Sequence, residues 1–214
     1  MSRRVTEWSE NLEDLNPQKG DLIEIDKIIY HHWGMYTSDK KIISFEPVDT
    51  AIMVLSLKFD DLVPAEVKIQ SIKKATGQSR FRINNKPKLD KTTRSYSEIE
   101  ELIETCLRCP RQLEYSLKYF NCEHFVTCLK FGVAYSDQMS SEKQFLFTLG
   151  LNMGASYLRE LNNEWETPDD AFRPMLEALE ASMKNEILVK PPIQRKVEQQ
   201  LERLFGKYNT KYLF

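Results

Sequence analysis

Cysteine and histidine are the residue types in this 214-residue chain that point most directly to covalent chemistry. Cys122 follows Asn121, a typical helix-capping residue, and precedes a helical pattern of apolar residues, so it falls in the first turn of a predicted helix. The positive end of the helix dipole favours thiolate over thiol there. The unsatisfied N–H groups of the same turn can receive the oxyanion of a tetrahedral intermediate. These features predict Cys122 as a nucleophile.

Three histidines are candidates for the base that activates this cysteine. His124 comes two residues after Cys122 and, on a helix, points about 200° away from it, so we expect it to cap or pack locally. His31 and His32 are neighbours on a predicted strand and face opposite ways. The alternation of a strand does not choose between these two, and at this level both stay open.

The remaining cysteines are interpreted as structural. Cys106 and Cys109 form a single C-x-x-C pair without a second pair, a pattern that does not favour zinc. Cys128 lies six residues after Cys122, off its helical face, and is expected in the core. We expect no metal and no cofactor. Few cysteines, and an N-terminus without the apolar core of a signal peptide, predict reduced thiols in the cytoplasm.

The elements that must position these groups are strands in the first half of the chain. Alternating apolar residues predict strands over residues 21–26, 32–36, 41–45, 51–59, 65–73 and 81–84. The polar residues 37–40 join two of these strands at hairpin length.

Helical periodicity follows in the second half. It predicts helices over residues 95–107, 122–131, 141–160, 168–185 and 193–208. Ser97 is the expected cap of the first, and Gly132 the expected stop of the second. The apolar residues 145–158 are too few to span a membrane and suit a core helix or a segment that touches a membrane surface. This order predicts an α+β fold with an antiparallel sheet and a packed helix.

Composition is that of a globular protein, with 41% hydrophobic and 29% charged residues. The net charge of −2 and the absence of a long basic stripe give no reason to expect nucleic acid as a partner.

Two motifs carry a resemblance to a known family. Asn121-Cys-Glu-His-Phe-Val126, followed by Phe131-Gly-Val-Ala-Tyr-Ser-Asp-Gln138, resembles the signature of the lecithin:retinol acyltransferase-like superfamily. The nearest branch is the H-Ras-like suppressor proteins, also called phospholipase A and acyltransferases. Residues 17–25, 30–36 and 82–86 match further family segments in the family's order, so the resemblance covers roughly residues 15–139.

The resemblance implies a fold, a chemistry and site residues. The fold is a circularly permuted NlpC-type, papain-like domain, in which the histidine strand precedes the nucleophile helix. The chemistry is transfer of an acyl group from a glycerophospholipid to a cysteine, and then to water, an amine or a lysophospholipid. The family's cysteine falls on Cys122, and its histidine, which precedes a tryptophan, falls on His32.

The sequence departs from the nearest branch at the third catalytic position. That branch has a second histidine on the next strand, where this chain has Ser44. A serine can hold an imidazole N–H by a hydrogen bond but supplies no charge. We take Ser44 as the third site residue. Glu46, two residues on and on the same strand face, and the absence of any third residue are the alternatives.

The C-terminal part is the second departure, because the nearest relatives end in an apolar membrane segment. We predict an N-terminal lead over residues 1–14, a catalytic domain over 15–140 and a helical extension over 141–214, with transient membrane contact at most. The leading hypothesis is a phospholipase and acyltransferase. The alternative is an interaction module that binds a protein partner through residues 141–214.

Overall fold

A computed structural model describes residues 4–27, 30–49, 62–86, 88–108, 113–117, 119–138, 191–206 and 211–212. The chain divides into one compact unit of residues 1–138 and 194–214 and a second unit of residues 139–193. The predicted strand over 51–59, the predicted helices over 141–160 and 168–185, the apolar stretch 145–158 and Cys109 lie outside the described residues. The predicted domain boundaries stay predictions.

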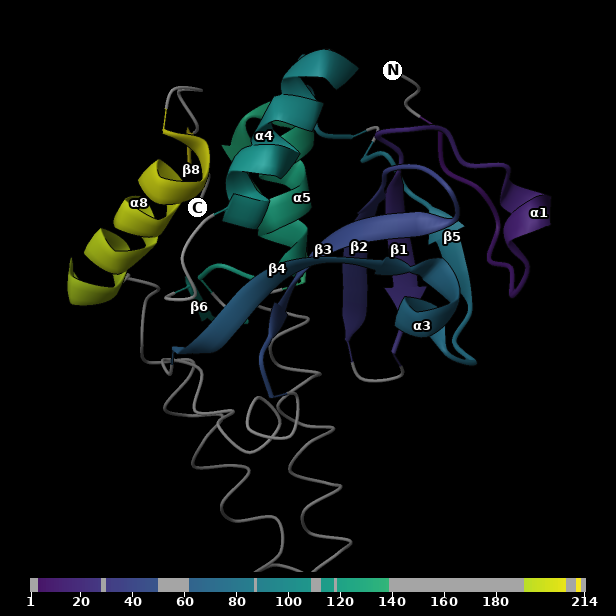
Figure 1. The fold of residues 1–214 in the computed structure, drawn as a ribbon, viewed down its shortest axis with the longest axis horizontal. Coiled ribbons are helices and arrows are strands. Elements are labelled where there is room, and N and C mark those ends of the chain that lie inside the picture. The colour runs from purple at the N-terminus through teal and green to yellow at the C-terminus, as the bar shows by residue number, and fades with distance from the viewer. Residues whose placement is uncertain are drawn as a thin grey trace, which may run out of the picture. The chain divides into compact units, whose positions relative to one another are not determined.

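An antiparallel sheet of six strands forms the centre of the first unit (Figure 1). The order across the sheet is β5-β1-β2-β3-β4-β6. The strands are β1 (Leu22–Asp26), β2 (His31–Tyr36), β3 (Lys41–Pro47), β4 (Val63–Ser71), β5 (Phe81–Ile83) and β6 (Leu113–Tyr115). The predicted strands over 21–26, 32–36, 41–45 and 81–84 are confirmed, and β6 was not predicted.

The hairpin of β2 and β3 depends on two local features. Its turn contains Asp39 and Lys40 at φ 51° and 59°, the left-handed region that a tight connection requires. Within β2, a Cβ atom on Gly34 would lie 2.6 Å from Ile42 Cδ1 of the neighbouring strand. A larger residue at position 34 would therefore displace the Ile42 side chain where β2 and β3 approach each other closely.

Two predicted helix and strand boundaries are corrected. β4 ends at Ser71 rather than 73, because the Ser71 hydroxyl accepts the N–H of Lys74 and caps the short helix α3 (Ile72–Thr76). The cap of α4 (Tyr96–Arg108) is Ser95 rather than Ser97. Ser95 Oγ accepts the N–H of Glu98, and Glu98 Oε2 accepts the N–H of Ser95, which is a capping box two residues earlier than expected.

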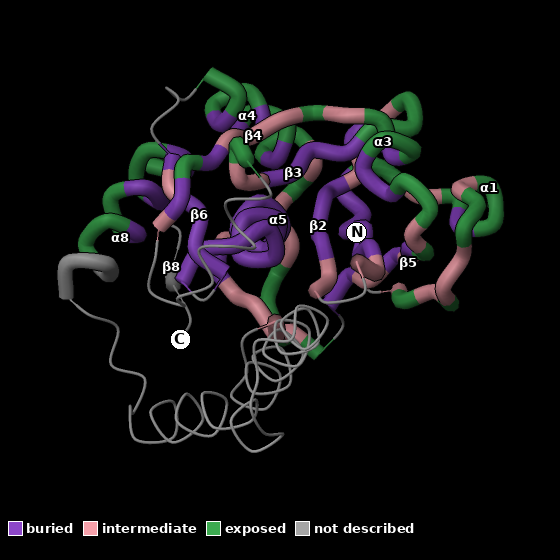
Figure 2. The backbone as a smooth tube through the Cα atoms, turned by 90° about the horizontal axis from the view of Figure 1, so that it is seen from below, coloured by how far each residue is buried: buried purple, intermediate pink, exposed green. Residues whose placement is uncertain are grey.

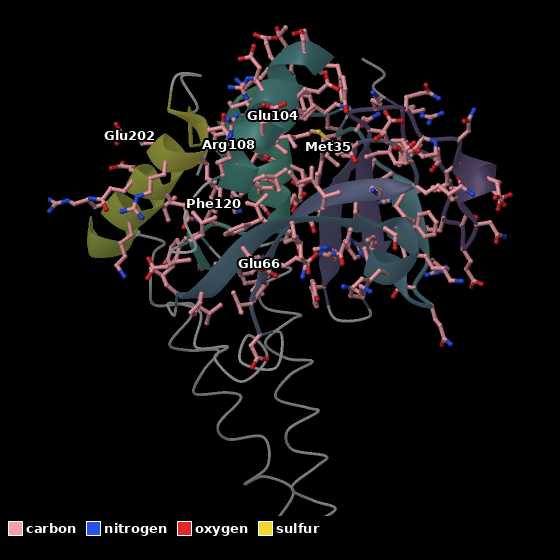
Figure 3. The ribbon with its side chains drawn as sticks, viewed as in Figure 1. Met35, Glu66, Glu104, Arg108, Phe120 and Glu202 are labelled. Atoms are coloured by element: carbon pink, nitrogen blue, oxygen red, sulfur yellow. The ribbon has the colours of Figure 1, made fainter. Side chains whose placement is uncertain are left out.

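The remaining described elements are α1 (Leu12–Leu15), α5 (Cys122–Phe131), α8 (Pro191–Phe205) and a parallel pair, β7 (Val133–Ala134) with β8 (Lys211–Tyr212). α5 and α8 confirm the helices predicted over 122–131 and 193–208. Helix α5 contacts β2, β3 and α4, and all ten of its residues are buried (Figure 2). By contrast, α4 has a solvent face, where Glu104 and Arg108 form an exposed ion pair of 3.2 Å (Figure 3).

Apolar side chains pack on both faces of the sheet. On one face lie Leu15, Ile23, Ile25, Ile42, Ile72, Ala75, Phe81 and Ile83. On the other, Phe45 contacts the rings of Tyr115, Phe120 and Phe125. Ile42 and Phe45 are three residues apart on β3, so they point to opposite faces. The second cluster positions α5 against the sheet.

Helix α8 packs against the same unit through its apolar stripe and through polar side chains. Phe205 contacts the Phe125 ring of α5 at a centroid distance of 6.1 Å. The Gln200 amide bonds both backbone groups of Glu114 on β6, accepting its N–H at 2.7 Å and donating to its carbonyl at 2.9 Å. Since β6 is the last strand of the sheet, Gln200 satisfies an edge that would otherwise need water or another strand. Among the described helices, none has the length and apolarity to cross a membrane.

We predict that Gln200→Ala lowers the free energy of unfolding by about 1–3 kcal/mol, because two partly buried backbone groups of Glu114 on β6 lose their partner. The matched control is Gln199→Ala, at an exposed position next to it on α8, which should change stability by less than about 0.5 kcal/mol. Urea unfolding followed by circular dichroism measures both. Equal effects of the two substitutions would contradict the role given to Gln200.

Candidate active site

The first turn of α5 is fixed by a capping box, as the sequence predicted for Asn121. Asn121 Oδ1 accepts the N–H groups of Glu123 (2.9 Å) and His124 (3.1 Å). His124 Nδ1 accepts the N–H of Asn121 in return, at 3.2 Å. Gly132 ends the helix at φ 72°, the expected stop. The cap occupies two of the N–H groups that we expected to receive an oxyanion, so that expectation is corrected for Glu123 and His124.

Cys122 is fully buried at the start of α5, among three polar partners. The Tyr115 hydroxyl donates to its sulfur at 3.6 Å, and the Gln138 side-chain amide donates at 3.7 Å. The Cys122 thiol lies 3.9 Å from the backbone carbonyl of His31. The sulfur therefore has hydrogen-bond donors on two sides, supplied by β6 and by the loop after β7.

His32 is the histidine that the structure brings to Cys122. Its imidazole interacts with the Cys122 thiol closely enough to influence the pKa of His32. Its buried Nε2 lies 3.2 Å from Glu46 Oε1, within ion-pair distance but off the direction of a hydrogen bond. Burial acts to lower the pKa of His32, but the contacts with Cys122 and Glu46 outweigh it and raise the pKa to about 9. The imidazole is therefore positively charged at neutral pH.

The other two histidines have separate partners. His31 Nδ1 pairs with Glu24 Oε1 at 2.5 Å and contacts the Trp8 ring. This confirms that His31 and His32 face opposite ways. Burial lowers the pKa of His124 to about 3, so this residue is neutral and serves in the cap, the local role that its spacing from Cys122 predicted.

Ser44 and Glu46 both lie at the site, but in different places. Ser44 Oγ donates to Glu46 Oε1 at 2.6 Å, and Glu46 is the residue that faces His32. Lys68 Nζ lies 2.7 Å from Glu46 Oε2. Burial acts to raise the pKa of Glu46, but His32, Lys68 and Ser44 together hold it at about 2. The catalytic role of Ser44 stays a prediction.

Tyr115 and Gln138 were not singled out from the sequence. Burial, together with the nearby Cys122, raises the pKa of Tyr115 well above its ordinary value, so its hydroxyl stays protonated and able to donate. Gln138 ends the second family motif, and that position was the available signal. No sequence signal marked Tyr115, because the strand that carries it, β6, has only three residues.

Glu123 fixes the loop that carries Gln138. Its fully buried carboxylate accepts from the Ser136 hydroxyl at 2.6 Å and from the N–H groups of Asp137 and Gln138 at 3.1 and 3.2 Å. Lys86 Nζ forms ion pairs with Glu123 and Asp137. The residue next to Cys122 thereby holds a donor beside the sulfur. In the described ranges, no group of three or more His, Cys, Asp or Glu side chains is arranged to bind a metal ion.

Comparison with known sequences gives consistent matches. A sequence model of the lecithin retinol acyltransferase family matches residues 15–135. The chain is 36% identical to phospholipase A and acyltransferase 1 of Rattus norvegicus over 144 residues, 64% of this chain and 79% of the relative. It is 37% identical to the Homo sapiens protein of the same name over 131 residues, 58% and 73% of the two chains. Phospholipase A and acyltransferase 2 of Homo sapiens is 33% identical over 129 residues, 58% and 76%.

We predict that Glu123→Gln lowers the free energy of unfolding by about 3 kcal/mol. The buried Lys86 ammonium would lose its ion pair with Glu123 and keep only the one with Asp137. The double variant Glu123→Gln with Lys86→Met should recover part of that loss, since it removes the orphaned charge as well. Thermal and urea unfolding measure both variants. If the losses of stability in Glu123→Gln and in Lys86→Met simply add up in the double variant, this coupling is contradicted.

Proposed function

The chain belongs to the lecithin retinol acyltransferase family, and from this we propose that it is a phospholipase A and acyltransferase that takes an acyl chain from a glycerophospholipid onto Cys122. The names of its relatives support the substrate class. The observation that carries the proposal is the contact between a buried thiol at a helix start and a charged imidazole, Cys122 with His32. This is the arrangement that nucleophilic cysteine catalysis requires.

Acylation proceeds through a tetrahedral intermediate. The Cys122 thiolate attacks the ester carbonyl carbon, and the carbonyl π electrons move to its oxygen. When the intermediate collapses, the carbon–oxygen bond to glycerol breaks, and the leaving alkoxide takes the proton of the His32 imidazolium. The products are an acyl thioester on Cys122 and a lysophospholipid. His32 is then neutral and ready to act as a base.

Deacylation reverses these roles. Neutral His32 removes a proton from the acceptor, which attacks the thioester carbonyl. The carbon–sulfur bond breaks, the Cys122 thiolate returns and His32 is again protonated. With water as the acceptor, the product is a fatty acid; with an amine or a lysophospholipid, it is an amide or a new ester.

Tyr115 and Gln138 supply the electrophilic side of the site. Their donors lie 3.6 and 3.7 Å from the sulfur, so they can reach an oxygen on the carbon bonded to it. Because the cap occupies the Glu123 and His124 N–H groups, side-chain donors take a larger part in stabilising the oxyanion than the helix start suggested.

The proposal extends to fold relationship and location. An antiparallel sheet with the histidine strand before the nucleophile helix suits a circularly permuted NlpC-type, papain-like domain. We place the protein in the cytoplasm with transient contact to the membrane that presents its substrate. The acyl donor and acceptor are to be found by assay.

Action as an interaction module through residues 141–214 is the second candidate. One observation bears on it: the apolar face of α8 packs against its own unit, where Leu204 and Phe205 are buried. A partner surface within this region would thus lie on residues other than the buried face of α8.

We predict that Cys122→Ala and His32→Asn each lower release of fatty acid from phosphatidylcholine vesicles by at least about 10²-fold, since each removes a reacting group. Cys128→Ala is the matched control, because Cys128 is buried on the same helix and takes no part in the proposed steps. Chromatography of labelled lipid products measures all three. Activity that survives Cys122→Ala would refute the proposal.

We predict that Gln138→Ala lowers kcat by about 10²–10³-fold, with a smaller change in KM, because it removes a donor to the oxyanion. Tyr115→Phe should act in the same direction, with the hydroxyl lost and the ring retained. Steady-state kinetics on a short-chain phosphatidylcholine checks both variants. If KM rose while kcat held, the two residues would be substrate-binding rather than oxyanion donors.

A further inference from the structure

We infer that Glu46 is the positioning residue for His32 in this chain, in place of the second histidine of the nearest branch, and that Ser44 acts by orienting Glu46. The inference rests on the proposed function, because it assigns the group behind the proposed base. It differs from the sequence-based expectation, which placed Ser44 itself against the imidazole.

Strand register accounts for the position of Glu46. Gly34 on β2 pairs with Ser44 on β3 in antiparallel register. Two residues outward along each strand come His32 and Glu46, whose side chains therefore leave the sheet on the same face. The result is the 3.2 Å approach of His32 Nε2 to Glu46 Oε1. The Ser44 hydroxyl donates to Glu46 Oε1, so Ser44 acts on the imidazole through Glu46.

Three neighbours restrict the Glu46 carboxylate. Ser44 Oγ donates to Oε1 at 2.6 Å, and Gln70 Nε2 donates to the same oxygen at 2.5 Å. Lys68 Nζ pairs with Oε2 at 2.7 Å. Both oxygens are thus held by neighbours other than His32, and the carboxylate cannot rotate without breaking several contacts. This is the support that a positioning residue needs.

A carboxylate differs from a histidine at this position because it carries a negative charge. Its negative charge stabilises the imidazolium that forms when Cys122 ionises, as the aspartate does in serine protease triads. The pKa values agree with this: His32 is raised to about 9 and Glu46 is lowered to about 2. Since the His32 pKa is raised, the imidazolium and its stabilising contacts are present at neutral pH and are lost as pH rises through about 9.

Other ionisable groups also influence this pair. Those near it in the described residues are Cys122 on α5, Lys68 and Glu66 on β4, Tyr115 on β6, and Tyr30 and Lys27 before β2. Lys68 opposes the inferred effect, because it shares the charge of Glu46. It pairs with Glu66 as well, at 3.5 Å, which makes Glu66 a control of the same charge and the same lysine partner (Figure 3).

The test is a titration of the histidine ring signals by nuclear magnetic resonance in the full-length protein without lipid. Substitution of each of the three histidines assigns its signal. We expect Glu46→Gln to lower the proton affinity of His32 at least about tenfold, a pKa change toward its ordinary value. Glu66→Gln should leave His32 within about twofold. An unchanged His32 in Glu46→Gln, or equal changes in the two variants, would overturn the inference.

Kinetics gives the second readout. Glu46→Gln should lower kcat about 10²-fold with a smaller change in KM, and the alkaline limb of the pH–rate profile should move to lower pH. Glu46→Asp keeps the negative charge but shortens the side chain by one methylene, which moves the charge away from His32. Its kcat should lie between those of the wild type and Glu46→Gln. If Glu46→Gln does not fold, Glu46→Asp carries the test, and a His32 titration equal to the wild type would overturn the inference.

The two proposals can fail separately. If the wild type releases no fatty acid from any phospholipid while Glu46→Gln still shifts the His32 titration, the proposed function fails and the assignment of Glu46 holds. If lipid is hydrolysed through Cys122 but His32 titrates identically in the wild type and Glu46→Gln, the function holds and the assignment of Glu46 fails.

Discussion

A buried imidazole that carries a charge must be balanced from both sides, and in this protein His32 is balanced by Cys122 and Glu46. Desolvation opposes the charge, so the balance holds only when both neighbours are fixed close to the ring. The register of β2 and β3 fixes Glu46, and the capping box of α5 fixes Cys122. The sheet thus positions one neighbour of the charged imidazole, and helix α5 positions the other.

The complete burial of α5 creates a second requirement, because its polar residues must find partners inside the protein. Lys130 Nζ donates to the Gly20 carbonyl at 2.7 Å and to Asn85 Oδ1 at 2.8 Å, and burial lowers its pKa to about 8. Glu123 has Lys86 and the loop N–H groups. Both ends of the helix are therefore tied to the sheet and its loops by polar contacts, while aromatic side chains fill the space between.

Much of this arrangement could be predicted from local sequence signals. Asn121 and Gly132 define the limits of α5 because capping chemistry acts over a few residues, and the alternation around residues 37–40 defines the hairpin. Signals of that kind cannot choose between His31 and His32, since the answer depends on the tertiary packing around Cys122; only the family resemblance did so. The same limit applies to Glu46, whose position depends on strand register, and to Tyr115, which reaches the sulfur through tertiary packing. The docking of α8 on β6 through Gln200 joins segments 86 residues apart, beyond any local pattern.

In the proposed reaction, an acyl group passes through a covalent bond to Cys122. The most direct measurement is mass spectrometry of the protein after brief exposure to phosphatidylcholine and an acid quench, with peptide fragmentation to locate the adduct. We predict one added acyl mass on the peptide that contains Cys122, removed by neutral hydroxylamine as a thioester requires. An acyl group on another residue, or phospholipid turnover with no adduct on Cys122 under any quench, would contradict the account.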